Sequence, residues 1–89
     1  MKCVVKRKGH EEKWNDKKLY ASCYAACYVA EMNRKQCERH AQRILKALKK
    51  RLKNKGCVDS HLLRDWVHAE LKKVHKEAAF LYKTHLDVN

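Results

Sequence analysis

The stretch Val4–Lys18 has the sequence VVKRKGHEEKWNDKK and decides the fold of this chain. Two short segments flank Gly9, and the first begins with two β-branched valines, a residue type that favours strands. Glycine accepts the positive φ that a tight turn between antiparallel strands requires. We therefore expect a β-hairpin over residues 3–14. Because two strands alone are marginally stable in water, we expect the hairpin to pack against helices.

Beyond the hairpin, apolar residues recur at intervals of three and four, which indicates helices. Asn15 or Asp16 is expected to cap the first helix, and Asn33 with Gln36 has the spacing of a capping box before the second. Gly56 is expected to end the second helix as its C′ residue. The expected helices span residues 16–30, 34–55, 60–74 and 75–86.

The predicted fold class is mainly α with a small N-terminal β-hairpin (α+β), in one domain over residues 1–89. The bundle has three or four helices, since the sequence leaves open whether a turn near residues 73–76 separates the last two. With no proline and two glycines, the chain has no linker-like or low-complexity segment. A core of this size leaves little room for a large enclosed active-site cavity.

The net charge of +12 predicts attraction to polyanions, which include nucleic acid, nucleotides and acidic protein partners. No apolar run approaches the roughly 18 to 20 residues of a membrane span. The N-terminus becomes charged again too soon for a secretory signal. We therefore expect a cytoplasmic protein with no membrane partner.

Five cysteines are present, and their odd number together with the lack of a secretory signal favours free thiols over a disulfide framework. Cys23 and Cys27 are four residues apart in the first expected helix, and Cys37 and His40 follow in the second. Such pairs can ligate a metal, but buried cysteine commonly acts as a small hydrophobe. We expect core packing here, with a metal- or redox-responsive domain as a weaker alternative.

Polar side chains gather where the hairpin meets the first helix: Lys6, Arg7, Glu12, Asn15 and Lys18. Paired cations beside a helix N-terminus suit phosphate groups. Glu12 offers an acceptor and Asn15 a donor and an acceptor, the combination that the edge of an adenine requires. No P-loop, Ser-His-Asp set or paired-carboxylate arrangement is present. The pattern indicates a binding module and not an enzyme.

Three blocks of the chain, in this order, resemble the ATP-cone. This family is the adenine-nucleotide-binding regulatory module of ribonucleotide reductases and of the bacterial repressor of reductase genes. The first block is VVKRxGxxExWNxxKL at Val4–Leu19. The second is VDSxxLxxWV at Val58–Val67, and the third is AAxLYxxHL at Ala78–Leu86. The resemblance covers essentially the whole chain, and it implies a hairpin that acts as a lid over a nucleotide.

The resemblance also implies a set of binding residues. These are Val5, Lys6, Arg7, Glu12, Asn15, Lys18, Ser60, Arg64 and His85. By this likeness Lys6 and Arg7 hold the phosphates, Lys18 adds charge near the ribose–phosphate end, and Glu12 and Asn15 recognise adenine. The implied ligand is ATP or dATP, with Mg²⁺ on its phosphates.

The function expected from the sequence is therefore a free-standing adenine-nucleotide-binding regulatory module, which acts on a separate partner or through self-association. Tyr20, Tyr24 and Tyr28 share a helix face, which favours either packing under the hairpin or a self-association surface. The alternative is a small basic helical nucleic-acid-binding protein with a vestigial nucleotide site. The charged face over Arg39–Lys55 would then follow a nucleic-acid backbone, and a role as a transcriptional regulator would follow.

Overall fold

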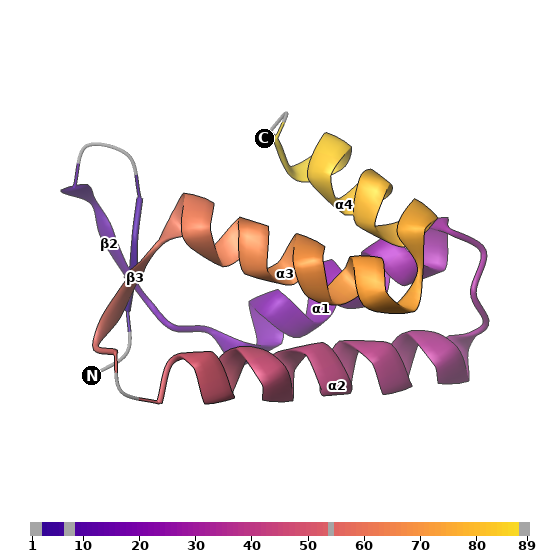
Figure 1. Cartoon of the computed structure of the whole chain (residues 1–89), viewed down its shortest axis with the longest axis horizontal. Coiled ribbons are helices and arrows are strands. Elements are labelled where there is room, and N and C mark those ends of the chain that lie inside the picture. The colour runs from indigo at the N-terminus through magenta and orange to yellow at the C-terminus, as the bar shows by residue number, and fades with distance from the viewer. Residues whose placement is uncertain (1–2, 7–8, 54, 88–89) are drawn as a thin grey trace.

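The computed structural model describes residues 3–6, 9–53 and 55–87, and for residues 85–87 it describes the backbone alone. Within these residues the chain is mostly helical with a small sheet, which confirms the predicted α+β class. The helices are α1 (Asp16–Val29), α2 (Arg34–Arg51), α3 (Ser60–Val74) and α4 (Lys76–Asp87). The strands are β1 (Cys3–Val5), β2 (Glu11–Lys13) and β3 (Cys57–Asp59). Figure 1 shows the sheet at one end of the helical bundle, next to the start of α3.

The sheet has the order β2-β1-β3, so it contains one strand more than the expected hairpin. β1 pairs antiparallel with β2 and parallel with β3, and Val4 lies opposite both Glu12 and Val58. Gly9 has a φ of 77° in the turn of the hairpin, as the sequence predicts for a glycine there. The third strand gives β1 partners on both sides, and three strands on a helical bundle are stable where a lone hairpin is marginal.

Side chains of the sheet alternate between two faces. Val4, Glu12 and Val58 form one cross-strand row, and both valines of this row are buried in the core. The residues on either side of each of them therefore belong to the opposite, outer face. We call the face with Val4, Glu12 and Val58 the inner face of the sheet.

Two helices begin with asparagine caps. The Lys18 backbone N–H donates to Asn15 Oδ1 (3.1 Å) at the start of α1. At the start of α2, Asn33 and Gln36 form the expected capping box: the Gln36 N–H donates to Asn33 Oδ1 (2.9 Å), and the Asn33 N–H donates to Gln36 Oε1 (3.1 Å). These caps fix where α1 and α2 start.

The expected end of the second helix at residue 55 is wrong, because α2 ends at Arg51 with Leu52 as its C-cap. Leu52 is fully buried, and the chain turns there. Gly56 is not the C′ residue of α2, since its carbonyl accepts a hydrogen bond from the Cys3 N–H (3.0 Å). Gly56 thus leads into β3, and the parallel strand pairing overrides the helix-stop signal.

His75 separates α3 from α4, which settles the number of helices in the described part of the chain at four. Its backbone is extended (φ −163°, ψ 111°), and its N–H donates to the Leu71 carbonyl (2.7 Å). Its Nδ1 then accepts a hydrogen bond from the Ala78 N–H (3.1 Å). One residue thus ends α3 and caps α4.

The core contains three free cysteines, Cys23, Cys27 and Cys37, as expected. Burial raises the pKa of Cys23 to about 12 and that of Cys27 to about 11, so both are neutral thiols near neutral pH. The expectation of free thiols is wrong for the other two, because a disulfide joins Cys3 on β1 to Cys57 on β3 across 54 residues. None of the described helices combines the length and apolar character that a membrane span requires.

Candidate nucleotide-binding site

A surface pocket with a volume of about 380 Å³ lies where the hairpin meets α1, α3 and α4. This volume falls within the range of small-molecule binding sites. Its described lining residues are Val4, Lys6, Glu12, Lys13, Asn15, Lys18, Leu19, Ser22, Ser60, Leu63, Arg64 and Tyr82. Segments far apart in the sequence therefore share one cavity.

The residues expected from the sequence fall into three groups. Six of them line the pocket together: Lys6, Glu12, Asn15, Lys18, Ser60 and Arg64. Val5 is not among the described lining residues, and its neighbour Val4 is. Val4 is on the inner face of the sheet and Val5 is on the outer face. Arg7 and the side chain of His85 lie outside the described residues.

Glu12 lies between two lysines in the lining of the pocket. Its Oε2 atom is 3.2 Å from Lys6 Nζ and 3.6 Å from Lys18 Nζ. The hydrogen bond from Lys6 is the largest cause that holds the pKa of Glu12 below its ordinary value, and Lys18 adds to it. One carboxylate oxygen thus brings a cation of the hairpin and a cation of α1 to the same place.

Asn15 positions the first turn of α1 beside this charge cluster. Its side-chain carbonyl is occupied by the cap of Lys18, so its amide NH₂ group is the part with donors to offer to a ligand. Trp14 precedes it, with its indole N–H donating to Asp16 Oδ1 (2.6 Å). The cap therefore leaves the NH₂ half of the Asn15 amide for further hydrogen bonds.

The opposite wall comes from the start of α3. The Asp59 side chain caps this helix by accepting from the His61 N–H (2.8 Å). Ser60 is the first residue of α3, and Arg64 follows one turn later on the same helix face, with both side chains half-buried. The pocket therefore meets the first turns of both α1 and α3, where helix dipoles favour negative charge.

Several lining residues were not singled out from the sequence. Val4, Leu63 and Tyr82 are buried and supply the apolar part of the pocket. Lys13, Leu19 and Ser22 complete the lining. Ser22 had a detectable signal, because it is four residues after Lys18 on the same face of α1.

The main alternative surface is the basic face of α2. Lys49 Nζ is 2.6 Å from Asp16 Oδ2, and Arg51 donates to Glu70 Oε2 (3.0 Å). Arg51 and Lys55 also lie over the ring of Trp66, at 5.5 and 5.2 Å from its centroid. Part of this charge is thus paired within the protein, and the face of Trp66 is covered where a nucleic-acid base would have to stack.

The described lining combines cations, the starts of two helices and apolar side chains, features that suit an anionic ligand and are typical of nucleotide-binding regulatory modules. The chain belongs to the ATP cone domain family, whose family model matches residues 2–84. ATP cones are adenine-nucleotide-binding regulatory modules and not catalytic domains. No curated protein matches the chain.

Proposed function

We propose that this chain binds ATP or dATP in the pocket between the hairpin and the helices, and that occupancy regulates a separate partner or self-association. The observation that carries this proposal is the position of Glu12 between Lys6 and Lys18. Without a ligand, the carboxylate keeps the two ammonium groups together. A nucleotide phosphate would provide the same negative charge in the same place.

Replacement of Glu12 by a phosphate as the partner of the two lysines would leave Glu12 and Asn15 to bind the base. When phosphate oxygens take over Lys6 and Lys18, the Glu12 carboxylate is released and can accept from the exocyclic amino group of adenine. The Asn15 NH₂ group can donate to the adjacent ring nitrogen, since the Asn15 carbonyl stays in the helix cap. Guanine presents a carbonyl oxygen where adenine has its amino group, so this oxygen and the Glu12 carboxylate would face each other as two acceptors with no hydrogen between them. Glu12 and Asn15 together would thus favour adenine over guanine.

Magnesium would enter with the nucleotide. Glu12 is the only carboxylate among the described lining residues, and it is already paired with lysines. Mg²⁺ commonly binds through the phosphates and water with few protein ligands. We therefore assign no protein ligand to it in this pocket.

Regulation would follow from linkage, because a ligand favours whichever arrangement it binds more tightly. The pocket is lined by both the hairpin and the helices, so a bound nucleotide favours the arrangement in which they lie closest. A neighbouring apolar groove of about 440 Å³ between α1 and α4 shares Lys18, Ser22 and Tyr82 with the pocket. This sharing supports a partner surface that responds to occupancy.

Helices α1 and α4, which line this groove, also carry exposed apolar side chains. Tyr28 is 64% exposed, Val29 52% and Phe80 63%. Val29 also lines the groove. Such side chains support contact with a protein, either a second copy of this chain or a separate polypeptide. Sedimentation with and without ATP measures self-association, and an unchanged mass of the isolated chain would leave a separate partner as the regulated species.

The cytoplasmic setting expected from the sequence stays a prediction.

Charge variants test the proposed phosphate site. Lys6→Ala and Lys18→Ala should each weaken ATP binding by about tenfold or more, since each removes a charge-assisted contact. Lys46→Ala is the matched control, because Lys46 is an exposed lysine on α2 outside the described lining of the pocket. Equal losses in all three variants would mean that net charge alone attracts ATP, which favours the nucleic-acid alternative.

A further inference from the structure

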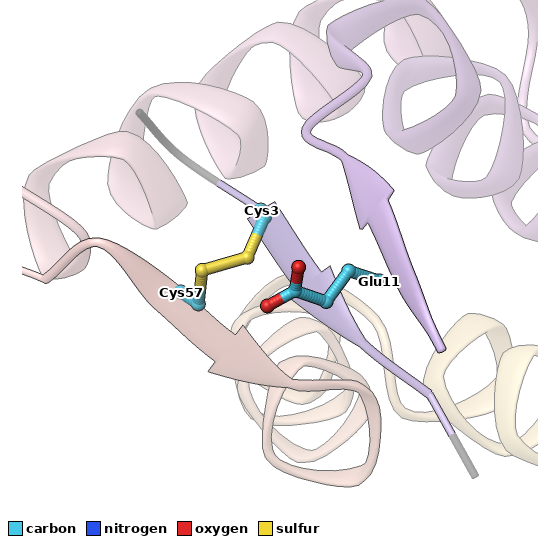
Figure 2. A group of neighbouring side chains, drawn as sticks. All are labelled: Cys3, Glu11 and Cys57. Carbon is cyan, nitrogen blue, oxygen red and sulfur yellow. A yellow bond between two sulfur atoms is a disulfide. The ribbon is translucent and has the colours of Figure 1, made fainter. Parts of the chain in front are cut away.

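The outer face of the sheet carries a cluster of metal-ligand side chains that the nucleotide site does not use. The Sγ atoms of Cys3 and Cys57 and a carboxylate oxygen of Glu11 all lie within 4.8 Å of one another. Figure 2 shows the Glu11 side chain reaching from β2 across β1 toward the disulfide. All three strands of the sheet thus contribute one residue to the cluster.

The strand register explains this convergence. Cys3 lies directly opposite Cys57 in the parallel pair, and Glu11 lies opposite Val5, two residues further along β1. Residues two apart share a face of a strand, so Cys3, Cys57 and Glu11 are all on the outer face. Glu12, the next residue after Glu11, is on the inner face and lines the nucleotide pocket. The side chains of the two adjacent glutamates therefore lie on opposite faces of the sheet.

We propose that the reduced protein binds a thiophilic divalent cation, such as Zn²⁺, through Cys3, Cys57 and Glu11. Two thiolates and a carboxylate are ordinary zinc ligands, and a water molecule would complete a tetrahedral set. In the oxidised protein the two sulfurs are bonded to each other, so the disulfide and the metal exclude one another. The sheet thus has two alternative cross-links between β1 and β3.

The chemistry balances with one added reactant, a dithiol or phosphine reductant. A dithiol supplies two electrons that cleave the S–S bond and is itself oxidised to a disulfide, whereas a phosphine is oxidised to its oxide with an oxygen atom from water. Each cysteine sulfur takes up one proton. Metal binding then releases these two protons as the two S–Zn bonds form. The oxidation state of the metal does not change.

Accessibility distinguishes this pair from the other cysteines. Cys57 and Glu11 are exposed and Cys3 is half-buried, so a reductant and a hydrated cation can reach them. Cys23 and Cys27 are buried in the core, and burial there disfavours the thiolate that a metal requires.

The test is a Co²⁺ and Zn²⁺ titration of the whole chain, before and after reduction with a phosphine that is then removed. The reduced protein should bind one equivalent with thiolate-to-cobalt charge-transfer absorption and release two protons, and the oxidised protein should not bind. Absence of binding to the reduced protein would overturn the proposal, as would equal binding to both forms.

Variants assign the ligands. Cys3→Ser with Cys57→Ser should abolish the absorption band, and a band that persists would place the metal on the buried cysteines and contradict the proposal. Glu11→Gln should weaken binding at least about tenfold, since even outer-shell partners of a metal contribute that much. This variant changes one exposed side chain, so it also tests the site if the serine variant does not fold. Glu38→Gln on α2 is the matched control, and equal affinity of both glutamine variants would exclude Glu11 as a ligand.

Discussion

Lys6 and Glu12 form an ion pair across the hairpin, with Lys6 Nζ 3.2 Å from Glu12 Oε2. The same oxygen is 3.6 Å from Lys18 Nζ on α1. These two contacts connect the hairpin to α1 through a single carboxylate. A ligand that competes for the two lysines changes the partners of Glu12 as well.

Replacement of Glu12 by glutamine should reduce the preference for adenine over guanine more than it reduces total affinity. The glutamine amide can present a donor to the guanine carbonyl, which the carboxylate cannot do. We expect the ratio of ATP to GTP affinity to fall on the order of tenfold, because a neutral carbonyl replaces the charged acceptor for the adenine amino group. Calorimetric titration with both nucleotides measures this ratio. Glu11→Gln is the control, since Glu11 lies on the outer face, and an unchanged ratio in Glu12→Gln would remove the adenine assignment.

Acid should lower the stability of the nucleotide-free protein, because it protonates the Glu12 carboxylate that pairs with the two lysines. Its pKa is lower in the folded state than the ordinary value of 4.5, so its contribution is present above that value and is lost as the pH falls through the folded-state pKa. The contribution is small because the pair is exposed. Melting temperatures of the parent and of Glu12→Gln should therefore converge as the pH falls below the ordinary glutamate range. A difference that stays constant with pH would show that the carboxylate charge has no such role.

The two asparagine caps offer a matched comparison. Asn15→Ala and Asn33→Ala should each lower the free energy of unfolding by about 1 kcal/mol, the usual cost of a lost N-cap. Asn15 lines the pocket, whereas Asn33 is not among the described lining residues. Only Asn15→Ala should therefore weaken ATP binding. Parallel urea denaturation and titration measure both quantities, and equal loss of affinity in the two variants would indicate a general effect of helix fraying.

Reduction of the Cys3–Cys57 disulfide should lower the free energy of unfolding by up to about 4 kcal/mol, from the chain entropy of a loop closed across 54 residues. Denaturation in urea with and without reductant measures this loss. The Cys3→Ser, Cys57→Ser variant should be as unstable as the reduced parent and insensitive to reductant. Sensitivity that persists in this variant would mean that another pair of cysteines is oxidised.

The helices were the predictable part of the fold because their signals are local. The asparagine caps and the apolar spacing define α1 and the start of α2, and the capping box of Asn33 and Gln36 forms as expected. All three strands have three residues, too few to show a period of two, and β1 and β2 are predictable only through the turn at Gly9 that joins them. β3 has no such turn to a neighbouring strand. Its pairing with β1 and the Cys3–Cys57 bond both depend on contacts across 54 residues, which no local pattern reports.

The candidate site likewise has a part that local sequence predicts and a part that depends on contacts between distant segments. Lys6, Glu12, Asn15 and Lys18 are near in sequence, and the hairpin–helix junction brings them together. The apolar floor, with Leu63 and Tyr82, depends on how α3 and α4 pack, so the sequence pattern alone did not assign it. Val5 is implied by the family resemblance, whereas Val4 is the valine among the described lining residues. The sequence alone does not fix the phase of a three-residue strand, and a shift of one residue exchanges the two faces.

The most direct test of the account is a calorimetric titration of the purified chain with ATP, dATP and GTP at two salt concentrations. We predict saturable binding of the adenine nucleotides that clearly exceeds GTP binding and persists at the higher salt, because directed hydrogen bonds to the base do not depend on net charge. Weak binding that is equal for all three nucleotides and lost at the higher salt would contradict the account. That result would mean that the charge of +12 attracts any polyanion.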